Sequence, residues 1–360
     1  MATPYNGALR QNEIFNSIYN MIISQQVFSD PIRNTYDKLA KLFKTDGSMY
    51  GDTKLFYSVQ VTGVDDWKAD EEASKLLSIK RPADPFCQSV TIDTFKMIWL
   101  TVDKFLSKRA WGSESVFAQF NSVILGTIRD TLRVYEASMV DAYVGTAETN
   151  EGKQTKTIVL TDGVSHAQTI AEELANLLIE IADISEDYND LGYLRSYDAN
   201  DLIFVWNSKA YNKIKKIDLP TIFHNENLVD RLGEYVLPAK YFGTVNTTAK
   251  ASADANTRSL IPQIITIDGT PTYFYAGQSI PTGTALVSGG EITVPSYQED
   301  EKVILKVVHK DALKYMSGFQ TETEFMNPRS LTNTHYLIFG HSSLAQSRLY
   351  EFPWITVKTN

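Results

Sequence analysis

The sequence SESVFAQFNSVILGTIRDTLRVYEASMVDAY, residues 113–143, decides the fold that we predict for this chain. Apolar residues recur along it with helical periodicity, while charged and amide side chains fill the other positions. The apolar stripe comprises Val116, Phe117, Phe120, Val123, Ile124, Ile128, Leu132, Tyr135, Met139 and Tyr143. Ser113 is a suitable N-cap and Gly145 ends the pattern. The stretch predicts one helix of roughly 45 Å, much longer than an average globular helix.

Gly126 interrupts the polar side of this helix. Glycine inside a helix costs about 1 kcal/mol relative to alanine, so we expect a bend or a close backbone contact there.

Upstream of the helix, the periodicity changes to two. Residues 55–61 read as one strand and residues 89–105 as a second, longer strand rich in β-branched and aromatic residues. An acidic stretch, residues 65–72, lies between them, so we predict a long hairpin with an acidic tip. The second strand is apolar on both faces, through Phe95, Met97 and Trp99 on one and Ile98, Leu100 and Val102 on the other. A two-stranded ribbon cannot cover both faces, so we expect a neighbouring subunit to cover it.

The first 50 residues predict an arm. Residues 8–28 carry a narrow apolar stripe at helical spacing, which Asp30-Pro31 stops, and residues 36–43 form a second short amphipathic stretch.

Downstream of the long helix, strands and helices alternate. A strand at 157–161 is followed by a helix that a Ser165/Gln168 capping box begins. We expect this helix to bury Ile170, Ala171, Leu174, Leu177, Leu178 and Ile181. A short apolar strand at 201–207 then leads into a helix at 208–216, which indicates a separate α/β domain.

Residues 235–310 are rich in Gly, Thr, Pro and Ser and predict short strands at 263–268, 272–276 and 303–308. Asp268-Gly269 marks a hairpin turn between the first two. Further strands follow at 334–339 and 354–358.

Composition narrows the functional classes. The chain has 360 residues, which suggests two or three domains of about 150 residues, and 43% are hydrophobic, which supplies a large core. A net charge of -9 argues against a general nucleic-acid binder. One cysteine, Cys87, excludes an internal disulfide and favours folding in a reducing cytosol, and we expect no membrane-spanning segment.

Sequence motifs for chemistry are weak. The chain lacks a phosphate-binding glycine loop and an H-E-x-x-H pair among its five histidines. Gly340-His341-Ser342 resembles part of a nucleophile elbow, but Leu344 stands where the motif needs a small residue. An acidic run is either a calcium site or, more simply, a solvated helix end. It comprises Glu180, Asp183, Glu186, Asp187 and Asp190. We therefore predict that no residue is catalytic, binds a cofactor or ligates a metal.

Three segments carry a resemblance to a known family. They are KRAWG before Ser113, residues 201–216 (DLIFVWNSKAYNKIKK) and residues 350–357 (YEFPWITV). With the order of elements, they resemble the major capsid protein of tailed bacteriophages, the Hong-Kong-97-type fold that encapsulins share. In that family they correspond to the junction between extended loop and spine helix, the strand–helix unit of the axial domain, and the final strand of the peripheral domain.

The resemblance implies an α+β capsid-type fold. It divides the chain into an N-terminal arm (1–50), an extended hairpin loop (51–110), the spine helix of a peripheral domain (111–156), an axial α/β domain with a β-rich insertion near 243–300 (157–325) and C-terminal strands returning to the peripheral domain (326–360).

The function that the resemblance implies is a major capsid subunit that self-assembles into pentamers and hexamers of an icosahedral head. It implies a separate scaffolding protein, a portal, an enclosed genome without sequence-specific binding, no membrane partner, and assembly in the host cytoplasm into a virion. The alternatives are an encapsulin-like cargo shell, another virion component, a pure binding module, or, in a different class, a hydrolase using Ser342 and His341.

Overall fold

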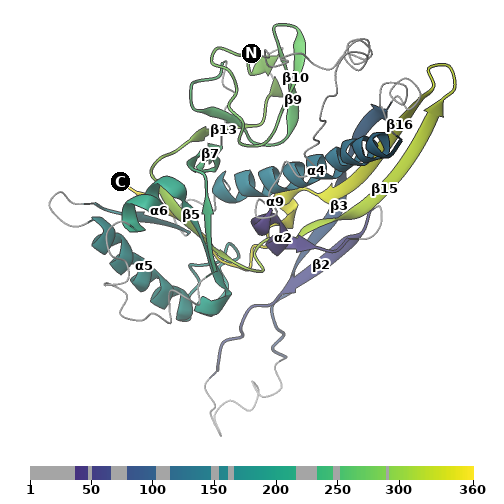
Figure 1. Cartoon of the computed structure of the whole chain (residues 1–360). Coiled ribbons are helices and arrows are strands. Elements are labelled where there is room, and N and C mark those ends of the chain that lie inside the picture. Colours follow the sequence, from purple (N-terminus) through teal and green to yellow (C-terminus); the bar gives the residue numbers. More distant parts are fainter. Residues whose placement is uncertain are drawn as a thin grey trace.

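The computed structural model describes most of the chain from residue 37 onward. The described residues are 37–47, 51–65, 79–102, 114–146, 154–160, 166–215, 233–245, 252–288 and 292–360. The expected N-terminal arm up to residue 36, the acidic tip at 66–78 and the KRAWG segment lie outside these residues. The fold is α+β, as predicted (Figure 1).

The predicted spine is one continuous helix, α4 (Glu114–Thr146). Its side chains are described from residue 126 onward, and those of Ile128, Leu132, Tyr135 and Met139 are buried as expected. The helix runs one residue past Gly145, where a Cβ would collide with the carbonyl oxygen of Tyr241. Gly145 therefore serves a close approach of α4 to the short helix η2 (Ala239–Tyr241), as well as lying near the helix end.

Of the two explanations that we gave for Gly126, a bend or a close backbone contact, the close contact is wrong. No described atom lies within 4 Å of the position that a Cβ would take there.

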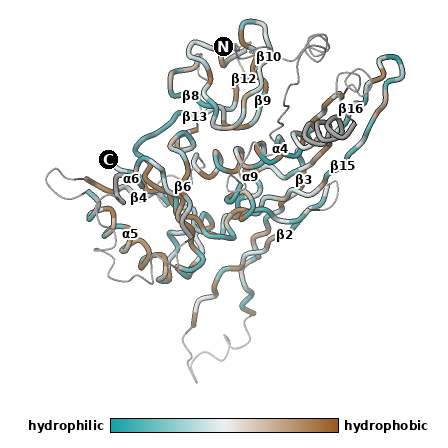
Figure 2. The backbone as a smooth tube through the Cα atoms, in the orientation of Figure 1, coloured by the Kyte–Doolittle hydropathy of each residue, from teal (hydrophilic) through white to brown (hydrophobic). Residues whose placement is uncertain are grey.

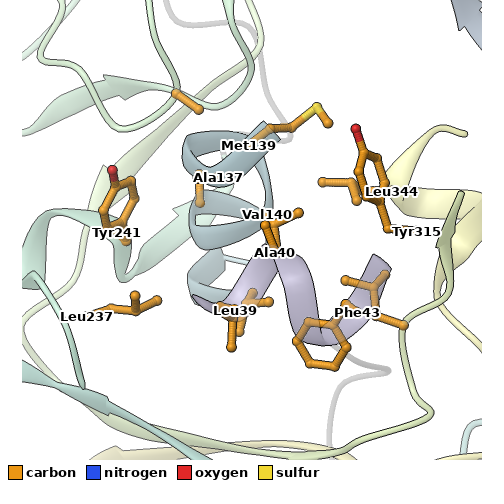
Figure 3. Packing of buried hydrophobic residues seen from close by; sticks show 14 of the residues in the cluster. Leu39, Ala40, Phe43, Ala137, Met139, Val140, Leu237, Tyr241, Tyr315 and Leu344 are labelled. Atoms are coloured by element: carbon orange, nitrogen blue, oxygen red, sulfur yellow. The ribbon is translucent and has the colours of Figure 1, made fainter. Parts of the chain in front are cut away.

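A short helix, α2 (Lys38–Phe43), crosses α4 and closes the core beneath it (Figure 3). Leu39, Ala40 and Phe43 are buried in the same cluster as Val140 of α4. The Arg133 Nε lies 3.3 Å from a carboxylate oxygen of Asp37, at the start of α2. Residues 37–47, which we expected within the N-terminal arm, are thus packed in the folded body.

The first five-stranded sheet contains the predicted ribbon and continues beyond it. Its order is β1-β15-β16-β3-β2. The bounds are β1 (Lys44–Thr45), β15 (Tyr315–Asn327), β16 (Thr332–Ser342), β3 (Phe86–Val102) and β2 (Thr53–Ser58). Only residues 86–91 of β3 pair with β2, whereas Ile92 to Val102 pair with β16. The expectation that the long strand has only one partner strand is therefore wrong, because β16 returns from far along the chain to pair with it.

The second five-stranded sheet contains the short apolar strand that we predicted at 201–207, and its order is β4-β17-β14-β5-β6. Its strands are β4 (Thr155–Ile158), β17 (Trp354–Thr359), β14 (Val303–His309), β5 (Leu202–Asn207) and β6 (Gly233–Leu237). Helices α5 (His166–Ala182) and α6 (Ser208–Lys215) pack against this sheet. All six apolar residues predicted for α5, from Ile170 to Ile181, are buried.

The final strand lies in a different sheet from the one that we expected. We expected it among the peripheral strands, but β17 pairs with β14 and β4 of the α/β sheet, while β15 and β16 both join the spine-helix sheet. Its residues explain this, because Trp354, Ile355 and Val357 are apolar on both faces of the strand and all three are buried, as suits the interior of a covered sheet.

A small β module occupies the predicted loop-rich region. A three-stranded sheet and two hairpins make it up, with a core of Ala253, Ile265, Phe274, Ile280 and Leu286. The strands are β7 (Gly243–Val245), β8 (Thr257–Ser259), β9 (Gln263–Ile267), β10 (Thr270–Phe274), β11 (Val287–Ser288), β12 (Ile292–Thr293) and β13 (Ser296–Glu299). Asp268 and Gly269 both have positive φ, 49° and 78°, which confirms the predicted hairpin turn between β9 and β10.

None of the described helices is long and apolar enough to cross a bilayer.

Candidate functional site

The most unusual surface is the outward face of the β15-β16-β3 sheet. Cross-strand pairing places twelve side-chain positions on this face in four rows. They are Phe95, Met97, Trp99 and Thr101 of β3, Thr334, Tyr336, Ile338 and Gly340 of β16, and Phe319, Thr321, Thr323 and Phe325 of β15. None of the twelve is charged, in a chain of which 21% of residues are charged. We call this surface the uncharged face.

Large side chains on the uncharged face are open to solvent. Trp99 is 61% exposed, Phe325 59% and Met97 52%. Phe95 and Phe319 contact each other edge to face, with ring centroids 6.0 Å apart, at the inner end of the face. Exposed apolar groups gathered on one surface are typical of a protein–protein contact, whereas isolated ones are normal.

The opposite face of the same strands is covered by the spine helix. Ile98 and Leu100 of β3 and Leu337 and Phe339 of β16 pack into the cluster around α4. The ring of Tyr135 on α4 meets that of Phe339 edge to face at 5.3 Å. Side chains at alternate positions of β3 thus form two faces, one covered by α4 and the other the uncharged face. In the sequence, both faces were marked by their apolar residues.

The ribbon presents a second exposed apolar surface. We use this name for β2, residues 86–91 of β3 and the described continuations 59–65 and 79–85. Side chains at every second position are exposed, namely Leu55 at 54%, Tyr57 at 61%, Val59 at 50% and Val61 at 62%. The ribbon leaves the body of the molecule, and hydrophobic stretches continue along it (Figures 1 and 2). Because β2 is the edge strand of its sheet, this apolar surface adjoins an open strand edge.

A polar cleft of about 500 Å³ lies between α4 and the outer ends of β15 and β16. Arg129 lies 3.7 Å from Glu322, and His335 lies 3.9 Å from Glu324. Gly126 also lines the cleft, which explains the empty space beside it. The ion pair between Arg129 and Glu322 is largely exposed, so it contributes little to stability. Among the residues that line the cleft, Thr323 is the one serine, threonine or cysteine. Thr323 belongs to the uncharged face.

His341 and Ser342, the pair considered for hydrolysis, are buried and do not form a nucleophile and base. The Nδ1 of His341 lies 2.9 Å from its acceptor, the carbonyl oxygen of Ser342, so Nδ1 carries the proton and Nε2 accepts from the Tyr135 hydroxyl, also at 2.9 Å. The Ser342 hydroxyl instead lies 2.7 Å from that of Ser347. Burial lowers the pKa of His341, which suits a neutral core imidazole. Their exposed fractions are 2% and 0%, so a substrate has no access.

The acidic run that could have bound calcium is divided among other partners. Asp190 is buried and forms an ion pair with Arg348, and Glu180 accepts a hydrogen bond from Tyr188 at 2.6 Å. Within the described part of the chain, no group of three or more His, Cys, Asp or Glu side chains could hold a metal ion.

Comparisons with known proteins agree with this geometry. A family model described as Phi29-like phage major capsid protein matches residues 8–355. No curated protein matches the chain.

Several solved structures share the fold at low identity. A chain from the capsid structure of Staphylococcus phage Andhra has a TM-score of 0.61 and 13% identity, covering 95% of this chain and 91% of that one. A chain from a structure of the head fibre and inner core protein of bacteriophage P68 has a TM-score of 0.63 and 11% identity, covering 94% and 88%. A chain from the capsid of Cyanophage P-SCSP1u has a TM-score of 0.51 and 10% identity, covering 99% of each.

Proposed function

The chain belongs to the family of Phi29-like phage major capsid proteins and forms a capsid shell, and from this premise we propose that the ribbon of one copy lies on the uncharged face of its neighbour. The observation that carries the proposal is the exposed apolar side of the ribbon, from Leu55 to Val61. A two-stranded ribbon that projects into water buries too little apolar surface to be stable by itself. Contact with a second copy supplies the missing burial.

The uncharged face supports the same pairing from the other side. Interface cores are depleted in charged residues and enriched in aromatic residues and methionine. Trp99, Met97 and Phe325 have this composition and are more than half exposed in the single chain. Such anchors contribute most of the binding free energy when they are desolvated at the centre of a contact.

The finer features of the assembly follow from the family. We expect the copies to form pentamers and hexamers, to assemble in the host cytoplasm with a separate scaffolding protein and a portal, and to enclose the genome. The net charge of -9 disfavours tight contact with phosphates, so we expect no sequence-specific binding of nucleic acid.

We also propose two modules within each copy, with boundaries that follow the sheets. The peripheral module contains α4 and the β1-β15-β16-β3-β2 sheet, and the axial module contains the β4-β17-β14-β5-β6 sheet, with β7 to β13 inserted. In this proposal no side chain is catalytic, and His341 and Ser342 contribute only to the core of the peripheral module.

Shortening the ribbon tests the proposal. Residues 63–85 are replaced by a two-residue turn, which keeps β2 and its pairing with β3. We expect a folded subunit that no longer forms shells, because the contact with the neighbour has lost most of its outer length. Negative-stain microscopy and sedimentation, with scaffolding protein co-expressed, measure assembly, and far-UV circular dichroism measures folding.

A second variant separates the two halves of the contact. Trp99→Ala leaves the ribbon intact and should also reduce shell yield, whereas Val159→Ala, at a similarly exposed position (64%) outside both surfaces, should not. Normal shells from the shortened ribbon would exclude the ribbon as an intersubunit arm.

A further inference from the structure

The base of the ribbon is held by the connector between β16 and β17, residues 343–353. This connector is one of the points at which the peripheral and axial sheets meet, because β16 belongs to the peripheral sheet and β17 to the axial sheet. On the axial side, the ion pair between Arg348 and Asp190 is buried, and the side chain of Gln154 donates to Asp190 at 2.6 Å. The guanidinium of Arg348 also lies over the Trp354 ring, 5.4 Å from its centroid. The connector is therefore fixed to the axial module by buried contacts.

Gln88 of β3 ties the ribbon to this connector. Its amide nitrogen donates to the carbonyl oxygens of Arg348, at 2.5 Å, and Gln346, at 3.2 Å. Its amide oxygen accepts from the backbone N–H of Tyr350 at 3.2 Å. The amide nitrogen and oxygen of this one side chain thus form hydrogen bonds with three backbone groups of the connector.

A second set of contacts joins the other strand of the ribbon to the axial module. The Ser58 hydroxyl donates to Glu351 at 2.6 Å, and the Arg195 guanidinium lies 3.0 Å from the same carboxylate. Arg195 also donates to the carbonyl oxygen of Val59 at 2.7 Å. The Tyr197 hydroxyl donates to the backbone carbonyl of Glu351 at 2.5 Å. Glu351 and Arg195 therefore link both the side chain of Ser58 and the backbone beyond it to the axial module.

These contacts are suited to fix the direction of the ribbon relative to the axial module, and they contribute little free energy. Hydrogen bonds weaken steeply when their angles change, whereas a partly exposed ion pair contributes little free energy. The side chains of Arg195 and Glu351 are 19% and 27% exposed. They also lie where β2 ends, so the ribbon beyond them acts as a lever. The seven residues from Val59 to Asp65 reach up to roughly 24 Å, so a tilt of about 10° at the base moves their end by about 4 Å.

We propose that Ser58, Gln88, Arg195 and Glu351 form a clamp that sets the angle between the ribbon and the axial module, and thereby the curvature of the shell. We call these four side chains the ribbon clamp. They are positioning residues that act through the ribbon. The inference rests on the proposed function of the ribbon as an intersubunit arm, because an angle at its base matters to assembly only if its outer part contacts a neighbour.

The angle can be measured in the isolated subunit. Val64, near the outer end of the described ribbon, is fully exposed, and Ile179 on α5 is 69% exposed. Spin labels on Val64→Cys and Ile179→Cys, in a Cys87→Ser background that removes the single cysteine, report the distance between the ribbon and the axial module by pulsed electron resonance. We expect Glu351→Gln, Arg195→Gln and Ser58→Ala to broaden this distance distribution at least twofold. The matched control is Lys209→Gln on α6, which removes an ion pair with Glu301. This pair lies in the same module but away from the ribbon, so the variant should leave the distribution unchanged.

Shell geometry is the second readout. The clamp variants should raise the fraction of tubes and wrongly sized shells in micrographs several-fold, with little change in the melting temperature of the subunit. A merely structural role would instead lower the melting temperature and the yield while leaving shell diameter unchanged. If Glu351→Gln does not fold, Ser58→Ala still decides, because it removes one hydroxyl from the clamp and leaves both charges in place.

The outcomes separate this inference from the function on which it rests. Wild-type distance distributions and shell diameters in the clamp variants, together with loss of shells on shortening residues 63–85, would overturn the clamp and leave the intersubunit arm standing. Normal shells after that shortening would overturn both.

Discussion

The two five-stranded sheets of this protein differ in how many of their faces are covered. Every residue of β5 and of β14 in the axial sheet is buried. Ile203 and Val205 of β5 pack into the cluster around α4, and the alternate residues, including Phe204, pack beneath α5. In the outer part of β3, in the peripheral sheet, Ile98 and Leu100 pack against the α4 cluster, whereas Trp99 on the other face is exposed.

The difference separates two kinds of apolar residue that look alike in the sequence. Apolar side chains in β5 are buried within one copy and stabilise the fold. Those on the uncharged face contribute little to the fold of one copy, because water still reaches them. We therefore expect changes in the axial sheet to lower subunit stability and changes on the uncharged face to lower assembly.

Two tryptophans provide the largest expected contrast. Trp354 of β17 is fully buried, so Trp354→Ala should lower the free energy of unfolding of the subunit by about 3–5 kcal/mol. Trp99→Ala should change it by less than about 0.5 kcal/mol, as is usual for exposed positions. Urea denaturation of dilute, unassembled subunit measures both. Equal losses would mean that the two sheets do not differ as described.

The spine helix tests the covered side of the peripheral sheet. Leu132 is 7% exposed and faces the cluster that contains Leu337 and Phe339, so Leu132→Ala should lower the free energy of unfolding by about 2–5 kcal/mol. The same prediction for Phe120→Ala concerns a side chain outside the described ones. Phe325→Ala, on the uncharged face, is the matched control. A loss under about 0.5 kcal/mol at Leu132 would show that the spine is not part of the core.

A buried carboxyl on α4 makes stability depend on pH. Burial raises the pKa of Asp141 to about 8, although the nearby ammonium of Lys240 opposes the shift. The folded state therefore binds a proton that the unfolded state releases above pH 4. The stability that this proton provides is present below about pH 4 and is lost as the pH rises towards 8, by up to about 1.4 kcal/mol per pH unit.

Asp141→Asn should remove this dependence, since the amide does not titrate. Melting temperatures of both proteins between pH 5 and pH 8 measure the difference, which should grow with pH in favour of the variant. Parallel pH profiles would contradict the raised pKa of Asp141.

The smallest effect is expected at a glycine. Gly126→Ala should raise the free energy of unfolding by about 0.5–1 kcal/mol, because alanine favours the helix and the added methyl group meets no described atom. Gly145→Ala is the opposite case on the same helix and should be strongly destabilising, because its methyl group would collide with the backbone of Tyr241. Thermal melting of the two variants compares them directly, and destabilisation by both would mean that Gly126 has an unseen neighbour.

Local patterns predicted the elements well. The apolar periodicity of α4 and α5, the strand–helix unit of β5 and α6, and the turn at Asp268-Gly269 are all set by residues close in sequence. Pairing between distant segments was not predictable in this way. Thr101 and Thr334 hydrogen bond across β3 and β16 although they are 233 residues apart, and no local signal connects them.

The candidate site divides along the same line. The apolar character of both faces of β3 was visible in the sequence, and from it we expected a neighbouring subunit to cover both. That expectation is wrong for one face, which α4 of the same chain covers, and only the other face stays exposed. The ribbon clamp could not be predicted from the sequence. Its members are ordinary polar residues that become a unit only when the connector brings them together, namely Ser58, Gln88, Arg195 and Glu351.

The long-range pairing of β3 with β16 has a consequence for the order of events during synthesis. At roughly 5–20 residues per second, a ribosome needs roughly 10–50 seconds after finishing Thr101 to reach its partner Thr334. During that interval β3 lacks the central strand of its sheet, and the uncharged face does not yet exist. Sheets built from such distant strands also fold slowly, because a long loop must close before the contacts form. A nascent subunit therefore cannot offer its uncharged face to the ribbons of finished copies nearby, and translation itself delays this half of the contact until most of the chain has left the ribosome.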